Sequence, residues 1–503
     1  MTVPTSGPIT GPTTGPSTGP VAAAGSGDVA PRTPAVIRWL VLATFVVILN
    51  ETIMINAIPR LMADLEVTAR AAQWLSTAFM LTMAAVIPVT GWFLQRVTTR
   101  AAFATAMTIF LTGTMLAAVA PVFEVLLLAR IVQAGGTAVM LPLLMTTLMT
   151  VVPEHDRGRV MGNVMLAISV APALGPAVSG IVLQLGSWRL IFVVVLPIAA
   201  AITVVGLQRL ENVGETREGD IDWFSVVAAA FGFGGLVYGL SQLGAGGMLG
   251  PLAMIAAGAT SIAVFIARQL WLQRHGVPLL DLRTLRHRTF TIALALMSVA
   301  FMAMLGSMIL LPLYLQDVRG LSALQTGLLV MPGGLAMGLL GPRVGRVFDR
   351  LGGRPLVIPG SLGILVALGA FTQVGLETPY AAILAAHVLL MISLAAVFTP
   401  VFTLGLGAVP MHLYSHGSSI LGTLQQVAAA VGTALVVTVM SSRAANLASD
   451  GAGDLDALLG GMRWAFAVGA GLSVVVVALA LLLPGRLDEA RVGDEELSPS
   501  TAS

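Results

Sequence analysis

Residues 91–100 read GWFLQRVTTR, and residues 345–354 read GRVFDRLGGR. Both stretches fit the pattern G-x3-[Q/D]-R-x3-R, and each one interrupts a long apolar sequence. Basic loops that contain glycines can recur by chance, but matched spacing in matched loops favours a true internal repeat. A repeat of this kind is typical of a transporter built from two related halves.

Long apolar runs surround both loops from residue 37 onward. A run of about 20 apolar residues spans the ~30 Å hydrocarbon core of a bilayer. We therefore predict an all-α membrane protein with fourteen spans, over residues 37–58, 73–94, 101–120, 124–150, 160–184, 188–208, 222–243, 248–272, 289–315, 322–345, 355–375, 378–408, 414–440 and 461–483.

The place of the repeat in this series predicts the domain organisation. The second copy starts eight spans after the first, so the simplest arrangement is six helices, two inserted helices and six more. The composition of the first tail, rich in Pro, Gly, Thr and Ser, predicts disorder. We expect six-helix bundles over residues 35–210 and 286–485, a linker with the inserted helices over 211–285, and cytoplasmic tails over 1–34 and 486–503.

The composition excludes most other classes of protein. Of the 503 residues, 56% are hydrophobic and 10% are charged, whereas a soluble domain carries about 25% charged residues. This excludes a soluble enzyme, a nucleic-acid-binding protein and a disordered chain. Cysteine is absent, which excludes disulfides, thiolate metal sites and cysteine nucleophiles.

Arginine supplies all 26 basic residues and sets the predicted orientation. With a cytoplasmic N-terminus, 19 arginines fall on the cytoplasmic side, 6 fall on the outer side, and Arg130 lies inside a span. Positive residues concentrate on the cytoplasmic side of membrane proteins. We therefore expect a multi-pass protein of the bacterial cytoplasmic membrane with both termini in the cytoplasm.

Several motifs resemble those of a known family. The repeated loop looks like the cytoplasmic loop motif of the major facilitator superfamily, and LNETIMINAIP (residues 49–59) is similar to the LDxTIVNVALP motif of its 14-spanner drug:proton antiporters. The NET sequence of span 1 and Gln95-Arg96 look most like the lincomycin-efflux branch. The resemblance covers about residues 36–485, and further matching motifs are RIVQAGGTAVMLP (130–142), APALGPAVSG (171–180) and HGSSILGTLQQVAAAVGTAL (416–435).

The chain departs from the family pattern at four places. Asn50 stands where the family has an Asp in span 1, and the acid is Glu51, one position further on. In the first loop, Gln95 replaces an Asp, and a Thr-Thr pair replaces a Gly-Arg pair. Ser179 replaces a Gly in span 5. These departures affect the family's proton site and its loop contacts.

Glu51 and Arg130 are charged residues well inside predicted spans. A charge inside a membrane is costly and by default marks a functional site. Glu51 lies seven residues before the outer end of span 1 and Arg130 six residues after the outer start of span 4, so both lie about 10 Å deep. We expect them to be partners, with Glu51 carrying the proton because Arg stays charged. The alternative is a static buried ion pair that fixes helix packing.

Two further groups of residues are candidates. Amides inside spans either hydrogen-bond helices together or bind a solute, and they are Asn50, Asn56, Gln73, Gln133, Asn163 and Gln426. Small residues and loop charges either seal one conformation and latch the cytoplasmic gate, or serve only packing and topology. They are Gly91, Gln95, Arg96, Arg100, Gly175, Pro176, Gly180, Gly345, Asp349, Arg346, Arg350 and Arg354.

The resemblance implies a proton-coupled antiporter that exports amphiphilic drugs or antibiotics, with lincosamides as candidates, by alternating access. No cofactor is expected: a chain without Lys cannot form a G-x-x-x-x-G-K-[ST] loop, and the proton gradient would drive export. The expected partners are a small amphiphilic substrate, protons and the bilayer, without nucleic acid, and the expected state is a monomer. The alternatives are a proton-coupled exporter of an endogenous metabolite or lipid and a non-transporting receptor or assembly factor.

Overall fold

The computed structural model describes residues 35–213, 216, 219–243 and 248–485. Over these ranges the chain forms helices joined by short connections, and it contains no strand. The all-α fold class is confirmed. The predicted tails over residues 1–34 and 486–503 lie outside the described residues.

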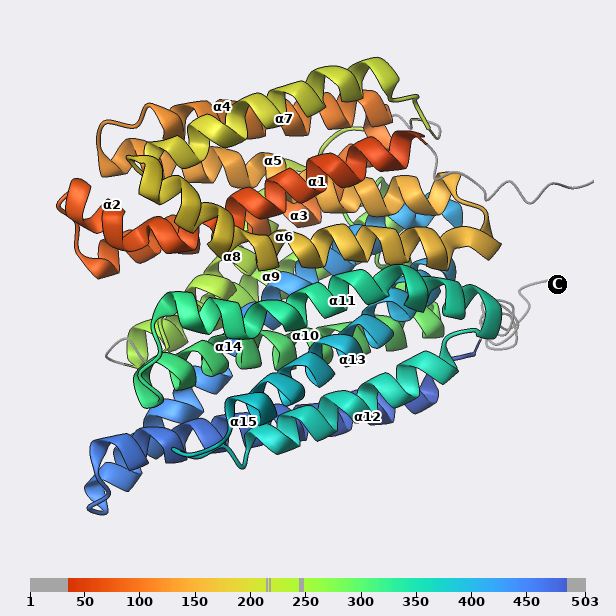
Figure 1. The fold of residues 1–503 in the computed structure, drawn as a ribbon. Coiled ribbons are helices and arrows are strands. Elements are labelled where there is room, and N and C mark those ends of the chain that lie inside the picture. The colour runs from red at the N-terminus through yellow and green to blue at the C-terminus, as the bar shows by residue number, and fades with distance from the viewer. Residues whose placement is uncertain (1–34, 214–215, 217–218, 244–247, 486–503) are drawn as a thin grey trace, which may run out of the picture. The chain divides into compact units, whose positions relative to one another are not determined.

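The N-terminal half runs from red to yellow in Figure 1. Its long helices are α1 (Ala35–Ile53), α3 (Ala69–Arg96), α4 (Thr99–Ala118), α5 (Phe123–Val151), α6 (Arg157–Leu185) and α7 (Arg189–Arg209). The C-terminal half runs from green to blue, and its helices are α10 (Arg288–Leu313), α11 (Ala323–Leu351), α12 (Arg354–Phe371), α13 (Tyr380–Gly407), α14 (Tyr414–Ser449) and α15 (Asp454–Leu482).

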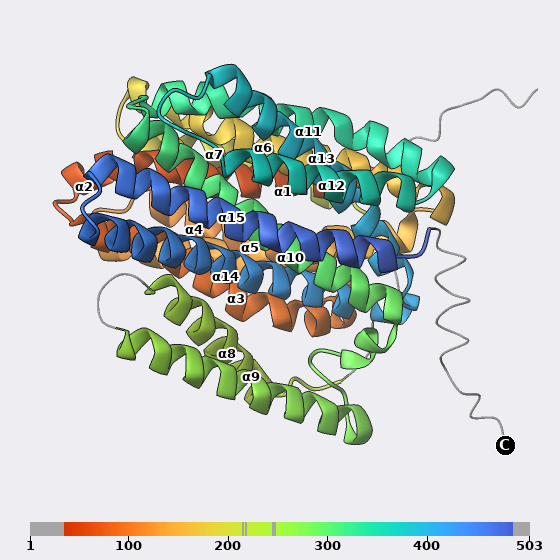
Figure 2. The same cartoon turned by 90° about the horizontal axis from the view of Figure 1, so that it is seen from below.

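Two inserted helices, α8 (Trp223–Ser241) and α9 (Leu249–His275), separate the halves in the sequence. They pack on each other, and α8 contacts both α3 and α14. Figure 2 shows the pair to one side of the two halves. Through α8, the inserted pair therefore contacts both halves.

Thirteen of the described helices are long and apolar enough to cross a membrane. The remaining predicted span corresponds to α6, which is 29 residues long. Some helices extend beyond the predicted spans, and α14 continues to Ser449, well past residue 440. The last residues of α14 (441–449) are largely polar or small, and most of them are exposed. A search for long apolar runs therefore does not detect this part of the helix.

Span 1 ends earlier than predicted. α1 ends at Ile53, a 3-10 turn covers Met54–Ala57, and the short helix α2 covers Ile58–Asp64. The prediction of one helix reaching residue 58 is therefore wrong. A proline in the first turn of α2 lacks the N–H that would continue the preceding helix and restricts the backbone before it. As a result, Glu51 lies in the last turn of α1.

Several arginines bind the carbonyl groups at the ends of neighbouring helices. Arg157 donates to Met149 O (2.9 Å), and Arg189 donates to Ala120 O (2.7 Å). The terminal carbonyls of a helix have no partner within the helix and carry partial negative charge. These arginines therefore join the ends of neighbouring helices.

Candidate functional site

Arg130 lies inside the N-terminal half on α5, and its side chain is buried at 1% exposure. Its Nη1 donates to Gln133 Oε1 (3.0 Å), and Gln133 Nε2 donates to Thr114 Oγ1 on α4 (2.9 Å). The guanidinium also lies over the ring of Phe79 on α3, 4.2 Å from its centroid. Arg130 is thus held by α3, α4 and its own helix through a hydrogen-bond chain and a cation–π contact.

Glu51 is a half-buried residue on α1, which packs against α5. Glu51 and Arg130 interact electrostatically. Among the described residues they form no hydrogen-bonded ion pair, and Arg130 Nε has no hydrogen-bond partner. A charge interaction without direct contact is strong only because apolar surroundings screen it weakly. The two predicted partners therefore interact through their charges, without a described hydrogen bond or ion pair between them.

Asn50 precedes Glu51 and is fully buried at 0% exposure. Neither its amide oxygen nor its amide nitrogen has a hydrogen-bond partner among the described residues. Leaving a buried amide unsatisfied costs about 1–3 kcal/mol for each group. Asn50 therefore does not hydrogen-bond helices together in this conformation, and the alternative of solute binding stays a prediction.

The other predicted amides are dispersed. Gln133 belongs to the Arg130 hydrogen-bond chain, so it connects α5 to α4. Gln73 is exposed on α3, whereas Asn163 on α6 and Gln426 on α14 are half-buried. The side chain of Asn56 lies outside the described residues. The structure thus joins one of these six amides directly to the Arg130 side chain.

The predicted small-residue contact in span 5 occurs at one of its positions. A Cβ atom at Gly175 would lie 2.5 Å from Thr52 Oγ1 and 2.8 Å from Thr52 Cβ. The missing side chain lets α6 touch α1 directly beside Glu51. A Cβ atom at Gly180 would meet no atom within 4 Å, so the expectation of a tight contact there is wrong for this conformation. The side chain of Pro176 lies outside the described residues.

The second loop copy joins the two halves through what we call the Asp349 contact. Asp349 Oδ1 accepts from the backbone N–H of Gly158 (2.8 Å), and Oδ2 accepts from that of Arg159 (2.7 Å). These donors open α6, where free N–H groups and the helix dipole favour an anion. Gly345, one turn before Asp349, lies against the Gly158 backbone, which permits the close approach of α11 to α6.

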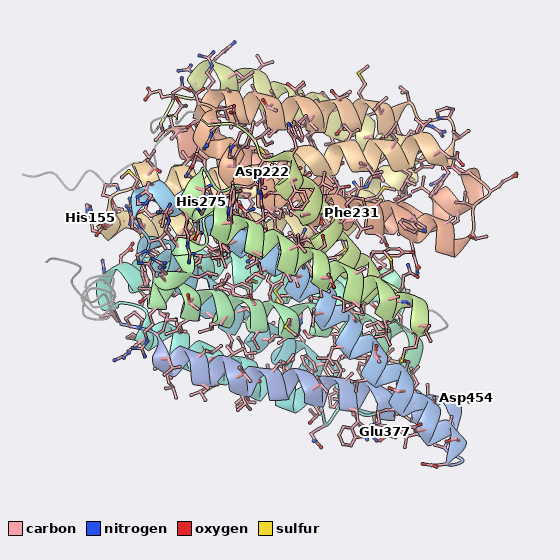
Figure 3. The ribbon with its side chains drawn as sticks, turned by 180° about the vertical axis from the view of Figure 1, so that it is seen from behind. His155, Asp222, Phe231, His275, Glu377 and Asp454 are labelled. Carbon is pink, nitrogen blue, oxygen red and sulfur yellow. The ribbon has the colours of Figure 1, made fainter. Side chains whose placement is uncertain are left out.

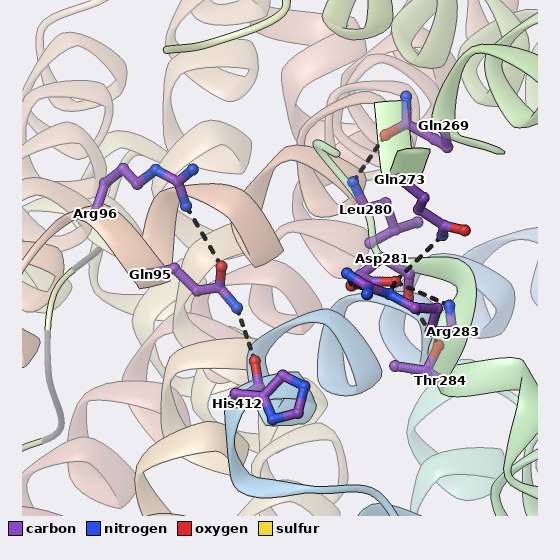
Figure 4. A network of polar contacts seen from close by, with 9 residues as sticks. All are labelled: Gln95, Arg96, Gln269, Gln273, Leu280, Asp281, Arg283, Thr284 and His412. Atoms are coloured by element: carbon purple, nitrogen blue, oxygen red, sulfur yellow. Dashed lines mark hydrogen bonds and ion pairs between the residues drawn. The ribbon is translucent and has the colours of Figure 1, made fainter. Parts of the chain in front are cut away.

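The first loop copy joins the halves differently, through what we call the Gln95 contact. Gln95 Nε2 donates to the backbone carbonyl of His412 (2.9 Å), as Figure 4 shows. Nearby, a Cβ atom at Gly91 would lie 3.0 Å from His416 Nδ1, and the Thr90 hydroxyl lies 2.7 Å from that of Ser419. In this copy, the neutral amide of Gln95 makes the contact between the halves, whereas in the other copy the carboxylate of Asp349 makes it.

The contacts that the structure describes for the loop arginines lie within a half or reach the segment before α8, and none of these contacts is the expected latch between the halves. Arg96 Nε donates to Gly219 O (3.2 Å), just before α8, and Arg354 Nε donates to Leu483 O within its own half (3.1 Å). Arg346 Nε donates to its own helix at Pro342 O, and Arg100 uses its backbone N–H to bind Asn212. Arg350 is exposed. The described polar contacts across the halves include those of Asp349 and Gln95, and glycines let the helices of the two halves approach closely there.

The Asp349 and Gln95 contacts lie at the same end of the helices, which we call the arginine-rich end because it carries both loop copies. Figure 3 places His155 and His275 toward this end, and Glu377 and Asp454 at the opposite end. Toward that opposite end, Gly180 on α6 and Gly327 on α11 face open space. The two halves are therefore closed at the arginine-rich end.

Sequence reasoning missed two hydroxyl pairs across the halves. Besides Thr90 with Ser419, the Thr146 hydroxyl on α5 lies 2.9 Å from that of Ser418 on α14. No spacing pattern signals such pairs, because Ser and Thr are common in membrane spans. Thr114, the end of the Arg130 chain, was also missed for the same reason.

Comparison with known proteins identifies the family. A model of the Major Facilitator Superfamily matches residues 40–433. The uncharacterized MFS-type transporter YcnB of Bacillus subtilis is 40% identical over 90% of this chain and 96% of its own. The lincomycin resistance protein LmrB of Listeria monocytogenes is 36% identical over 84% of this chain and 88% of its own.

The fold also matches that of solved transporters. The crystal structure of the human organic anion transporter MFSD10 aligns with a TM-score of 0.64 at 14% identity, covering 88% of this chain and 98% of that chain. The resemblance to the lincomycin-efflux branch and to the major facilitator fold is confirmed by these matches. The chain therefore belongs to the Major Facilitator Superfamily, a superfamily of multi-pass membrane transporters and not of enzymes.

Proposed function

We propose that this transporter is a proton-coupled antiporter that exports amphiphilic drugs or antibiotics, lincosamides among them, by alternating access. The observation that carries the proposal is the acid Glu51 beside the fixed cation Arg130 inside the N-terminal half. Lincosamides are suggested by the name of the Listeria monocytogenes relative. We further propose that no cofactor takes part, that the protein acts as a monomer, and that the arginine-rich end and both termini face the cytoplasm.

The contacts of α6 support a mechanism for the proposed coupling. When Glu51 loses its proton, its attraction to Arg130 increases, and the end of α1 is drawn toward α5. Gly175 of α6 touches Thr52, the residue after Glu51, so α6 responds to the position of the α1 end. The same helix begins at the Asp349 contact, about 26 Å away at 1.5 Å per residue. A rigid α6 therefore links the protonation of Glu51 to the closure between the halves.

The direct test is drug-induced proton release in proteoliposomes that contain the full-length protein. Lincomycin and a set of lipophilic cations serve as solutes, and Glu51→Gln is compared with the wild type. Glu377→Gln is the matched control, because Glu377 is exposed outside the spans and its change removes the same charge. We expect the signal in the wild type and the control, and its loss in Glu51→Gln.

The other outcomes separate the alternatives. Equal signals in all three proteins would leave antiport standing and contradict Glu51 as the proton carrier. A wild type that is silent with every solute would contradict drug antiport, and would favour an endogenous substrate or a non-transporting receptor.

A further inference from the structure

His387 is a buried histidine inside α13, in the C-terminal half, and its side chain is 4% exposed. A Cβ atom at Gly333 of α11 would overlap the ring at Cδ2 and lie 2.5 Å from Nε2, so the imidazole lies directly against the α11 backbone. The backbone of Val330 is within electrostatic reach of the ring, but neither Nδ1 nor Nε2 has a hydrogen-bond partner in the described part of the chain. Buried polar groups are normally hydrogen-bonded, so packing alone does not explain a histidine at this position.

The internal repeat gives His387 a counterpart in the other half. α5 and α13 are each the fourth long helix of their half, and both begin at the end opposite the arginine-rich end. Arg130 lies seven residues after Phe123, which begins α5, and His387 lies seven residues after Tyr380, which begins α13. Each half therefore holds one nitrogen base about 10 Å from the same end. Arg stays charged, whereas imidazole gains and loses its proton near pH 6.5.

The other charged and titratable groups around His387 lie toward the ends of the helices. α13 packs against α6, α10, α11, α12 and α14. Toward the arginine-rich end, these helices carry Arg157, Arg159, Arg288, Arg343, Arg346, Asp349, Arg350, Arg354, Tyr414 and His416, and toward the opposite end lie Tyr314, Asp317, Arg319, Tyr380 and Arg443. Along α11, Arg343 is ten residues from Gly333, or about 15 Å. Within the described stretches of these helices, no carboxylate lies at the level of His387 to neutralise a protonated ring.

A protonated ring is therefore unfavourable in the closed conformation. It would place a positive charge in apolar surroundings without a paired anion, which is costly. The cover over this site includes the other half, because α6 packs against both α11 and α13. At Gly338, five residues after Gly333, the α11 backbone lies against Val170 of α6. When the halves separate at the arginine-rich end, α6 uncovers this side of the helix pair, and water can reach the ring and solvate its charge.

We propose that His387 is a proton-binding site of the C-terminal half, and that its protonation favours the conformation that is open at the arginine-rich end. The inference rests on the alternating access of the proposed function, but not on Glu51 as the proton carrier. A ligand shifts a population toward the conformation that binds it better. A ring that titrates near pH 6.5 when open and stays neutral when closed raises the ratio of open to closed molecules about tenfold between about pH 7.5 and 5.5. In the proposed orientation, His387 thus responds to the pH of the cytoplasm.

The test measures the two conformations directly and needs no transport. The full-length protein carries spin labels on cysteines introduced at His155 and Met411, which are exposed and belong to different halves. Double electron–electron resonance in nanodiscs gives the ratio of long to short distances as the pH is lowered. We expect the about tenfold rise in the labelled wild type and its loss in His387→Gln, because glutamine is polar but does not titrate.

His275→Gln is the matched control. His275 is an exposed residue at the end of α9, so its replacement removes an imidazole without touching α11 or α13. This control should keep the response to pH. Any response that other titratable groups add, Asp349 among them, is present in all of these proteins and does not affect the comparison.

A second pair of variants leaves every titratable group in place. Gly333→Ala puts a methyl group where the ring lies and displaces the imidazole from its buried position in the closed conformation. It should therefore weaken the response to pH, even if His387→Gln does not fold. Gly327→Ala adds the same methyl group to the same helix, where it would meet no atom within 4 Å, and it should keep the response.

The proposal is overturned if His387→Gln and His275→Gln respond to pH equally, or if Gly333→Ala and Gly327→Ala do. Asp349→Asn at neutral pH separates this failure from a failure of the proposed function, because it weakens the closed end without changing His387. If Asp349→Asn lengthens the distance while the pH does not act through His387, the proton site at His387 alone is overturned. If neither change alters the distances, alternating access at this end is overturned together with it.

Discussion

Replacing Asp349 by Asn should open the arginine-rich end of the transporter. The carboxylate accepts hydrogen bonds from the backbone N–H groups of Gly158 (2.8 Å) and Arg159 (2.7 Å) in the other half. Hydrogen bonds to a charged group contribute about 1.5–3 kcal/mol each, and Asn keeps one neutral acceptor, so the net loss is about 2 kcal/mol. In the open state both partners are hydrated, and the loss therefore acts on the closed state alone.

A loss of about 2 kcal/mol lowers the ratio of closed to open molecules about 30-fold. A population that is about 95% closed would then become about 40% closed. The Gln95 contact is a single neutral hydrogen bond worth about 1 kcal/mol, so Gln95→Ala should lower the same ratio only about fivefold.

The assay is the distance between two spin labels across the closed end. The chain contains no cysteine, so cysteines introduced at His155 and Met411 are labelled specifically. Both positions are exposed, and each lies in a different half. Double electron–electron resonance gives the populations of short and long distances, and Asp349→Asn should shift weight to the long distance.

Asp222→Asn is the matched control. Asp222 precedes α8, and its partners Arg268 and Ser225 lie within the inserted pair, so its loss should leave the distances unchanged. An unchanged distribution in Asp349→Asn would refute the assignment of the Asp349 contact as a latch. An equal shift in Asp222→Asn would show that the effect is not specific to the Asp349 contact.

Three further predictions follow from the packing and the charges. Gly175→Ala should reduce drug efflux from cells by tenfold or more at equal expression, because its Cβ overlaps α1, whereas Gly180→Ala should not. Gln133→Leu should lower the unfolding midpoint measured by differential scanning fluorimetry, because it costs about 1–3 kcal/mol by removing the hydrogen-bond partner of Arg130. The pKa of Asp281 is lowered because hydrogen bonds from its neighbouring arginine outweigh burial. The stability that the ionised Asp281 carboxyl contributes to the fold should therefore be complete above the unfolded pKa of about 3.9 and should decline as the pH falls toward the folded pKa. The difference in unfolding midpoint between the wild type and Asp281→Asn should accordingly shrink on acidification.

The sequence was sufficient for the spans and the family, because both are properties of single segments. The length of an apolar run decides whether it spans a bilayer, so most predicted spans lie within a few residues of the observed helices. The end of α14 was missed because its last turns are polar. The end of α1 was missed because the prediction followed hydropathy past the proline that opens α2.

The sequence also indicated Glu51 and Arg130, because charged residues are rare inside membrane spans and usually mark functional sites there. It did not reveal which polar groups surround them. Gln133 was equally consistent with solute binding or helix packing until the structure showed its bonds to Arg130 and Thr114. Such partners come from different helices, and no local spacing specifies them.

The largest difference concerns the repeated loop. Its pattern alone identified two related halves, and it led us to expect that arginines would latch them. Only the tertiary structure placed Asp349 at the start of α6 and Gln95 against His412, residues that are far apart in the chain. Hydropathy and motif spacing indicate whether each segment spans the membrane. The contacts that close the gate depend instead on which helix ends lie within hydrogen-bond distance after the two halves have packed together.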